Sequence, residues 1–337
     1  MYQQATISFE AALLLCKSAA LKYGASEQIA SSLAAATVAA HARGQASVGF
    51  GHFFDYLDSI ADGRINPVAF PVISRPTPVV ISSDAQCGIA QLGFDVVFEE
   101  LVATTEKFGL AIFTQRNSYT CGALGYFAER LAERGLMALA AGNAPALMAA
   151  GGAKKPIYGT NPIAFAAPQL NGPPLLIDQA SSATAYVNIR AAAEAGRPLP
   201  EGWALDDVGD STTDPVQALK GALLAFGGVR GGNIALMVEM LAVISGANWS
   251  LDAPSFLTGE KCPCVGMVVI AIAPQLIDPT FPARVSDQLS RLHEEYGVFI
   301  PGIKKADALK QSYENGLTIA PELYAKLCAI VESTPLR

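Results

Sequence analysis

The sequence predicts an α/β fold, because strand-like and helical segments alternate in its middle while both of its ends are helical. Between residues 79 and 142 the pattern runs strand, helix, strand, helix, strand. Of the 337 residues, 51% are hydrophobic and 16% are charged, a balance that supplies a core and excludes disorder. The length fits two domains, or one large domain with an appendage.

Each element is predicted from the period of its apolar side chains. In the first 45 residues this period is helical, and Ser8 and Ser26 stand where hydroxyl groups cap two helices. Further helices are expected over 53–60, 93–108, 124–134, 231–245, 282–296 and 321–331. Strands are expected over 79–82, 110–114, 137–142, 163–167, 175–178 and 266–273. Four prolines within 67–78 predict a boundary or an extended linker.

Charge and hydropathy exclude several classes of protein. Lys and Arg number 23 and Asp and Glu 30, which gives a net charge of −7, and no basic tract is present for binding nucleic acid. Polar residues and prolines interrupt every apolar stretch before it reaches the roughly 20 residues of a membrane span. The opening residues Met1 to Ala5 hold no secretory signal. We therefore expect a cytoplasmic protein.

No metal site is expected. The chain has three histidines, so a three-histidine site would need all of His41, His52 and His293. The six cysteines are scattered, which is typical of reduced thiols rather than a disulfide framework. Cys262 and Cys264 stand too close together for the usual zinc knuckle, and no second pair accompanies them.

Several polar or glycine-rich segments are candidates for binding. There is no P-loop, and Gly49-Phe50-Gly51 lacks the third glycine of a Rossmann fingerprint. Gly159-Thr160-Asn161-Pro162 is a turn whose side chains bond either the neighbouring backbone or a ligand. The glycines of 227–232 precede a helix beside Arg230, which makes them either a phosphate site or a flexible hinge. Asp178, at the end of an apolar strand, either orients a catalytic group or caps the next turn.

Taken together, these segments resemble the type-2 malate/L-lactate dehydrogenase family. The family also holds sulfolactate, ureidoglycolate and diketogulonate enzymes and the Δ1-piperideine/Δ1-pyrroline-2-carboxylate reductases. The resemblance spans nearly the whole chain. It is carried by Gly159-Thr160-Asn161-Pro162, Leu176-Ile177-Asp178 with Ser181-Ser182, Gly202-Trp203-Ala204-Leu205-Asp206, Thr212-Thr213-Asp214-Pro215 and Gly227-Gly228-Val229-Arg230-Gly231.

The resemblance implies an NAD(P)-dependent oxidoreductase that acts on a small carboxylate. It also implies a mixed α+β sheet with a non-Rossmann NAD(P)-binding domain, and a helical domain built from both termini. The expected division is a helical, dimerising and substrate-side region over 1–75, a mixed-sheet cofactor region over 76–280, and helices over 281–337 that return to the helical domain. The family is usually homodimeric, with its site near the subunit contact.

Two departures from the family stand on the substrate side. The family motif Ser-His-Gly, followed by Arg and then Tyr, here reads Ser47-Val48-Gly49, with His52 in place of the Arg and Tyr56 kept. The motif Asn-Ser-x-His-x-Gly reads Asn117-Ser118-Tyr119-Thr120-Cys121-Gly122. Val48 and Thr120 therefore replace both family histidines.

These departures bear on the substrate. Hydride addition to a ketone creates an alkoxide, and a positioned acid accelerates that step roughly 10²–10⁴-fold. An iminium accepts hydride to give a neutral amine, so the protein need not supply a proton in that step. The sequence therefore favours a 2-imino carboxylate such as Δ1-pyrroline- or Δ1-piperideine-2-carboxylate, or else a 2-oxo acid. One alternative is a 2-hydroxy-acid dehydrogenase with His52 as relocated acid or base, and another is a non-catalytic cofactor-binding protein.

The resemblance and these arguments give each candidate residue a role. The catalytic candidates are Ser47, His52 and Asp178. The substrate-binding candidates are Ser47, His52, Tyr56, Asn117, Tyr119, Thr120 and Thr160. The cofactor-binding candidates are Thr160, Asn161, Leu176, Ile177, Asp178, Gln179, Ala180, Ser181, Ser182, Val229, Arg230, Gly302, Ile303 and Lys304. The cofactor is NAD(P)H, and the sequence leaves the choice between NAD and NADP open.

Overall fold

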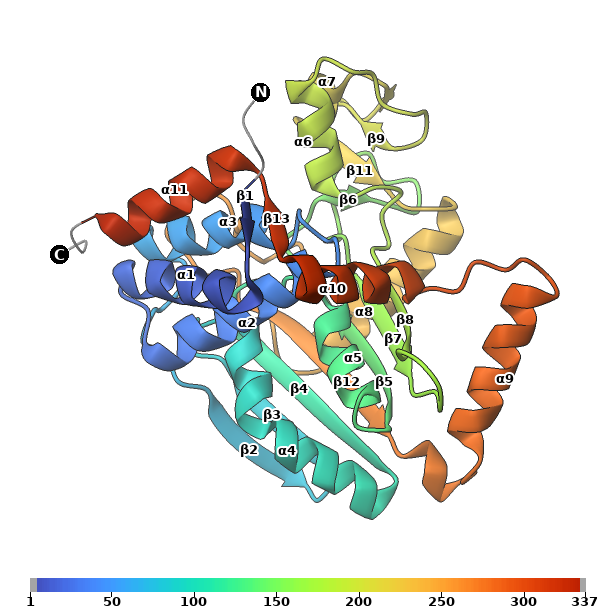
Figure 1. Ribbon diagram of the computed structural model, residues 1–337. Helices are drawn as coiled ribbons and strands as arrows, with labels where there is room; N and C mark the ends of the chain where they lie inside the picture. The colour runs from blue at the N-terminus through green and yellow to red at the C-terminus, as the bar shows by residue number, and fades with distance from the viewer. Residues whose placement is uncertain (1–4, 334–337) are drawn as a thin grey trace.

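The computed structural model describes residues 5–333 and builds them around a mixed sheet of seven strands (Figure 1). Across the sheet the order is β2 (Val72–Thr77), β3 (Val80–Asp84), β4 (Leu110–Ser118), β12 (Val265–Ile272), β5 (Met137–Gly142), β7 (Ile163–Ala167) and β8 (Leu175–Gln179). Neighbouring strands are antiparallel, except that β3 and β4 are parallel. The prediction of a mixed α/β fold is confirmed. Met1 to Gln4, the start of the segment searched for a secretory signal, lie outside the described residues.

The other elements are helices and short strands. Some of the helices cover the large sheet, and other elements form two further regions. The helices are α1 (Phe9–Lys22), α2 (Glu27–Ala42), α3 (Phe50–Ala61), α4 (Ala90–Phe108), α5 (Gly125–Ala132), α6 (Tyr186–Glu194), α7 (Pro215–Ala218), α8 (Val229–Val243), η1 (Pro274–Leu276), α9 (Phe281–Glu294), α10 (Ile303–Asn315) and α11 (Pro321–Glu332). The short strands are β1 (Ala5–Ile7), β6 (Met148–Ala149), β9 (Ala204–Leu205), β10 (Ser211–Thr212), β11 (Ala222–Leu224) and β13 (Leu317–Ile319). None of these helices is long and apolar enough to cross a membrane.

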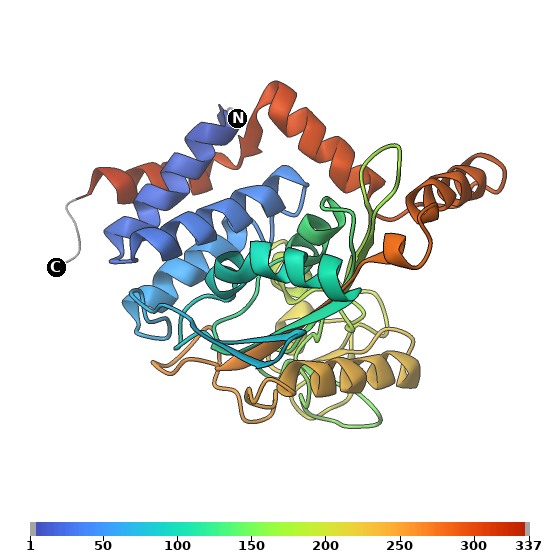
Figure 2. The same cartoon turned by 90° about the horizontal axis from the view of Figure 1, so that it is seen from below.

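Helices cover both faces of the large sheet. In Figure 2, α4 lies on one side of the strands and α8 on the other. Side chains alternate between the faces of a strand, so adjacent residues of β12 belong to opposite cores. Val269 packs in the core with Phe94 and Phe127 of α4 and α5, whereas Val268 packs with Val238 of α8.

Segments from both ends of the chain form one helical region. β1 pairs with β13 in antiparallel register, Ala5 opposite Ile319, and α11 lies beside α1 (Figure 1). The predicted caps are confirmed, since the Ser8 and Ser26 hydroxyls accept hydrogen bonds from backbone N–H groups in the first turns of α1 and α2. The apolar faces of these helices bury a common core that includes Leu33 of α2 and Leu327 of α11.

A small sheet in the order β10-β9-β11-β6 forms the third region, with α6 and α7 packed beside it. It lies next to the carboxyl ends of β5 and β8, because β6 follows β5 and an isolated bridge joins Ser182 to Ala225. This region therefore faces the end of the large sheet where the polar turns emerge.

The proline-rich stretch 67–78 differs from the prediction, because it contains β2, the edge strand of the large sheet, rather than only a boundary or linker. An edge strand pairs on one side only, so a proline there removes no hydrogen bond that the sheet needs. β2 is almost wholly exposed, and this explains why its sequence lacks the alternating apolar pattern of a strand. It also runs across the expected division at residue 75.

Candidate active site

A cavity of about 360 Å³ opens where the helical region, the large sheet and the small sheet meet. Its wall is formed by the loop between α2 and α3, by α3 itself, by the turns after β4, β5 and β8, by α6 and by the loop before β12. Seven predicted site residues line it: Ser47, His52, Thr120, Thr160, Asp178, Gln179 and Ala180. Val48 lines it too, so both positions where the family has a histidine face the same space.

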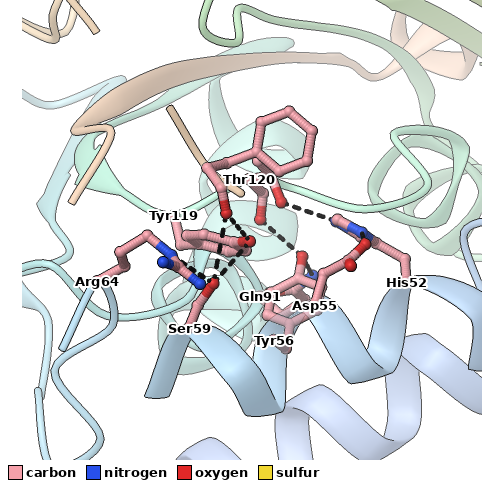
Figure 3. Close-up of polar contacts among 9 residues, drawn as sticks. His52, Asp55, Tyr56, Ser59, Arg64, Gln91, Tyr119 and Thr120 are labelled. Atoms are coloured by element: carbon pink, nitrogen blue, oxygen red, sulfur yellow. Dashed lines mark hydrogen bonds and ion pairs between the residues drawn. The ribbon is translucent and has the colours of Figure 1, made fainter. Parts of the chain in front are cut away.

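His52 stands in this wall between two polar partners (Figure 3). Its Nδ1 atom lies 2.7 Å from a carboxylate oxygen of Asp55, and its Nε2 atom lies 3.0 Å from the Thr120 hydroxyl. His52 and Asp55 share a face of α3 because they are three residues apart. These contacts hold the imidazole in place. Its Nε2 atom lies beside Thr120, the position at which the family has its second histidine.

Tyr56 and Tyr119 lie behind the wall rather than in it. The Tyr56 hydroxyl donates to the Thr120 carbonyl at 2.7 Å, and the Tyr119 hydroxyl donates to the Phe256 carbonyl at 2.8 Å. Both side chains are buried, and burial raises the pKa of both phenols. Ser59 donates to Tyr119 at 2.9 Å and accepts from Arg64 at 3.0 Å (Figure 3). These contacts fix the wall residues Thr120 and Phe256.

Asn117 lies outside the cavity wall. Its side-chain amide donates to both carboxylate oxygens of Asp84, at 3.0 and 3.1 Å, and its φ is 54°. The neighbouring Cys121 does line the cavity, and burial raises the pKa of its thiol to about 12. It is therefore protonated near neutrality.

Thr160 and Asn161 take different positions within one turn. Thr160 lines the cavity, whereas Asn161 is fully buried and donates to Glu239 at 2.7 Å. The buried Glu239 carboxylate also accepts from the backbone N–H of Ser250 at 2.6 Å and from Asn143 at 3.4 Å. One carboxylate on α8 therefore anchors two turns that shape the cavity.

Asp178 is the penultimate residue of β8 and has its carboxylate at the edge of the cavity. Its Oδ2 atom accepts hydrogen bonds from Gln45 at 3.1 Å and from Lys305 at 3.2 Å. Gly125, at the start of α5, lets the helix approach, since a Cβ atom there would come within 2.8 Å of the same oxygen. Asp178 thus links the helical region to the sheet.

The remaining predicted cofactor residues form a continuous strip beside the cavity. The Leu176 N–H lies 3.4 Å from the Pro301 carbonyl, and Gly302, at φ 96°, packs so closely that a Cβ atom would meet the Leu176 N at 2.9 Å. At the other end, the Phe226 N–H donates to the Ser181 carbonyl at 3.1 Å. The structure thereby brings together 176–182, 226–231 and 301–305, which lie far apart in the sequence.

Residues of the strip differ in exposure. Ser181 and Ser182 are buried, and their hydroxyls donate hydrogen bonds to the carbonyls of Asn161 and Thr184, respectively. Leu176 is buried and Ile177 is half-buried. Val229 and Arg230 are exposed at the start of α8, and Ile303 and Lys304 are exposed at the start of α10. None of these residues lines the cavity.

The other two histidines lie apart from the cavity. His41 packs against the Phe50 ring, with centroids 4.3 Å apart, and its Nε2 atom lies 2.9 Å from the Thr318 carbonyl. His293 is exposed on α9. Neither of the two histidines to which the resemblance gives no role therefore lines the cavity.

Sequence reasoning missed five side chains at the site: Gln45, Asp55, Arg190, Phe256 and Lys305. A signal existed for two of them. Asp55 follows His52 at helical spacing, and Lys305 is next to the predicted Lys304. Gln45, Arg190 and Phe256 reach the site only through tertiary packing.

Known proteins resemble this chain along most of its length. The sequence profile of the malate/L-lactate dehydrogenase family matches residues 7–328. A Δ1-pyrroline-2-carboxylate/Δ1-piperideine-2-carboxylate reductase of Pseudomonas putida is 34% identical over 305 residues, 89% of each chain. A (2R)-3-sulfolactate dehydrogenase (NADP⁺) of Chromohalobacter salexigens is 34% identical over 302 residues, covering 89% of this chain and 90% of that protein.

The solved structure of Δ1-piperideine-2-carboxylate reductase from Pseudomonas syringae superposes with a TM-score of 0.93. It is 32% identical and covers 97% of this chain and 99% of its own. The sequence match and the shared fold agree with the resemblance of the motifs. The chain belongs to the malate/L-lactate dehydrogenase family.

Proposed function

We propose that the protein is an NAD(P)H-dependent oxidoreductase that reduces a small cyclic 2-imino carboxylate. Membership of the family makes the chain an oxidoreductase. The observation that carries the substrate is the composition of the cavity wall. Val48 and Thr120 both face the cavity, and neither is an acid that protonates an alkoxide. The relatives named as pyrroline- and piperideine-2-carboxylate reductases support the same class of substrate.

The reaction fits a cavity of this kind. A protonated cyclic imine already carries the positive charge that attracts hydride, so reduction at carbon leaves a neutral amine without a proton transfer. Asp55 and Asp178 supply negative charge at the wall, which stabilises an iminium. Arg190 and His52 line the same cavity and provide cationic or hydrogen-bonding partners for the carboxylate.

The strip beside the cavity fits a dinucleotide. The first turn of α8 presents free backbone N–H groups to a phosphate, with Arg230 beside them. Gly302 keeps open a close backbone approach that any side chain would fill, and Lys305 adds a cation 3.2 Å from Asp178. When bound, NAD(P)H supplies the hydride. The predicted residues of the strip would hold it, and the mainly antiparallel sheet order supports a non-Rossmann binding mode.

A 2-hydroxy-acid dehydrogenase is the second candidate, and the His52–Asp55 pair favours it. A carboxylate bonded to one imidazole nitrogen fixes the tautomer and leaves the other nitrogen free for proton exchange. Here that other nitrogen faces Thr120 at the cavity wall. His52 would then replace the missing family acid.

A substrate panel tests the proposal. Δ1-Pyrroline-2-carboxylate and Δ1-piperideine-2-carboxylate are compared with pyruvate and oxaloacetate, each with NADH and with NADPH. We expect the cyclic imines to have the highest kcat/KM. Fast turnover of the oxo acids without turnover of the imines would identify the second candidate. Cofactor binding by fluorescence, with no turnover of any substrate, would identify a non-catalytic protein.

The surroundings of α9 support a homodimer. This helix projects from the body of the molecule in Figures 1 and 2, although Ser286 accepts hydrogen bonds from the β7–β8 turn. Phe281, Val285, Leu289 and Leu292 form an apolar stripe on it at helical spacing. Such a stripe is typical of a helix that packs on another surface. We propose that a second copy covers it, in a cytoplasmic enzyme. Light scattering of an α9 variant, Leu289→Glu with Leu292→Glu, tests this, and dissociation is expected.

The core clusters support the proposed division of the chain. One cluster joins residues of 1–75 with residues of α10 and α11, and also takes in Ile89, Leu92 and Tyr119 of the middle region. The buried residues of another cluster all lie within 76–280, with Ile73 packed against them. We propose that 1–75 and 281–337 form the helical region and that 76–280 forms the cofactor region, with β2 lying across their border.

A further inference from the structure

Three cysteine thiols converge in the structure, although the sequence offers only one close pair. The Sγ atoms of Cys87, Cys262 and Cys264 all lie within 4.8 Å of one another, and those of Cys87 and Cys264 are 3.9 Å apart. All three side chains are partly exposed, so an ion from solvent reaches them. The third thiol comes from 177 residues away along the chain, and no spacing rule detects it.

The geometry matches the donor set of a thiophilic divalent cation. With zinc–sulfur bonds of about 2.3 Å in a tetrahedral site, neighbouring sulfur atoms lie about 3.8 Å apart. The observed Cys87–Cys264 distance is 3.9 Å. The Cys264 N–H points at the Cys262 sulfur, 3.4 Å away, and such a donor stabilises a metal-bound thiolate. Three protein ligands leave the fourth position to water.

The backbone holds two of the three thiols in place before any ion binds. Cys87 and Cys264 have φ values of 61° and 51°, a region that side chains other than glycine adopt only when their surroundings impose it. The Cys87 N–H donates to the Asn117 carbonyl at 2.9 Å, and the Asn248 N–H donates to the Cys264 carbonyl at 3.0 Å. Binding therefore needs little reorganisation of the chain.

Nearby charge is also compatible with a cation held by thiolates. Asp84 is the last residue of β3, three positions before Cys87, but its carboxylate already accepts hydrogen bonds from Arg116 at 3.1 Å and from Asn117 at 3.0 Å. Because Arg116 balances the negative charge of Asp84, this carboxylate adds little repulsion to the thiolates. An acidic chain of net charge −7 attracts cations generally.

We propose that Cys87, Cys262 and Cys264 bind one zinc-like divalent ion, which ties the loop 255–261 to the segment after β3. Phe256 and Leu257 of this loop line the cavity. Arg64 donates a hydrogen bond to the Gly259 carbonyl at 2.6 Å, which holds the middle of the loop. The metal holds the end of the loop that precedes Cys262. The ion has a positioning role and takes no part in the hydride step, so the proposal stands independently of the substrate.

Cadmium binding to the full-length, reduced and chelator-treated protein tests the site. Cd²⁺ bound to thiolates gives an ultraviolet charge-transfer band, which we expect to saturate at one ion per chain and to decline on competition with Zn²⁺. Cys87→Ser and Cys264→Ser should lose the band. Cys328→Ser, which removes a partly exposed thiol of α11, should keep it and is the matched control. Circular dichroism confirms that each variant is folded.

Two results would overturn the metal site. One is an equal band in the wild-type protein and in folded Cys87→Ser. The other is an absence of Cd²⁺ uptake by the reduced protein, with two titratable thiols lost on exposure to air, which would identify a disulfide instead.

Limited proteolysis tests the link to the loop. Lys261 is exposed and immediately precedes Cys262, so trypsin reports on the freedom of this segment. We expect Zn²⁺ to slow cleavage after Lys261 in the wild-type protein and in Cys328→Ser, and to have no effect in Cys87→Ser. Unchanged cleavage in a wild-type protein that binds Cd²⁺ would contradict the positioning role.

Discussion

The Nδ1 atom of His52 lies 2.7 Å from the carboxylate of Asp55, and this pair occupies the wall of the cavity. Both side chains belong to α3, which packs in the helical core through Phe53 and Leu57. The ring therefore has little freedom to turn away. A histidine held in this way is placed to replace the missing family acid, and its removal separates the two candidate reactions.

Substituting His52 by Asn should affect oxo-acid and imine reduction differently. Loss of a general acid is expected to lower kcat/KM for an oxo acid by about 10²–10⁴-fold, while reduction of a cyclic iminium falls less than about tenfold because that step needs no acid. Steady-state kinetics with both substrate types measure the split. Asp58→Asn, on the exposed side of α3, is the control. Equal losses for both types would show that His52 serves binding alone.

Lys305 and Lys304 form a matched pair for testing the cofactor strip. Lys305 reaches Asp178 at 3.2 Å, whereas Lys304 lies over the Phe299 ring. Replacing Lys305 by Met leaves Asp178 without its cation at the edge of the cavity, and we expect about tenfold weaker NAD(P)H binding. Lys304→Met should stay within about twofold. Fluorescence titration measures both, and the reverse order would assign the role to Lys304, as the family resemblance implies.

Glu239→Gln should destabilise the protein and loosen the cavity turns. Asn161 and the Ser250 N–H both donate hydrogen bonds to the Glu239 carboxylate. A glutamine has an NH₂ group in place of one carboxylate oxygen, so one of these donors would face another donor. We expect a loss of about 2 kcal/mol in the free energy of unfolding, measured by urea denaturation. Glu260→Gln, at an exposed position, is the control, and an unchanged midpoint in Glu239→Gln would contradict the anchoring role.

His41 should make stability depend on pH below neutrality. Burial lowers the pKa of His41 from its ordinary value of 6.5, although the Thr318 carbonyl opposes this shift. Between the two pKa values the unfolded chain binds more protons than the folded one, so the free energy of unfolding falls as the pH drops below 6.5.

Urea denaturation at about pH 7.5 and about pH 5.5 measures this fall. His41→Asn should reduce the difference between the two pH values, whereas His293→Asn, on the exposed helix α9, should leave it unchanged. The same difference in wild-type protein and His41→Asn would rule out His41 as the source.

Local sequence signals located most regular elements because hydrophobic period and caps act over a few residues. Met137–Gly142 and Ile163–Ala167 match the predicted strands, whereas α3 and α4 each begin three residues before their predicted starts. β2 was missed because an exposed edge strand has no apolar face. α10 was missed because its residues have no buried side, so no stripe marks them.

The sequence predicts the site residues that belong to local motifs. It does not predict the residues that reach the site, or turn away from it, through tertiary packing. Ser47, His52 and Thr160 reach the wall as expected. Asn161 has the right sequence position but turns into the core toward Glu239, since a turn alone does not fix which side faces in. Cys87 joins Cys262 and Cys264 only through the pairing of distant loops.

The pairing of β1 with β13 has a consequence for biosynthesis. Ala5 faces Ile319 in that ladder, so a ribosome must deliver more than 300 residues before the first strand has its partner. Until then α1 lacks the cover of α11 and α2 lacks the cover of α10, and their apolar faces stay open to chaperones or to neighbouring chains. Such non-local closure is slow. Truncations within the last helix should therefore reduce the yield of folded protein before they alter the chemistry of the cavity.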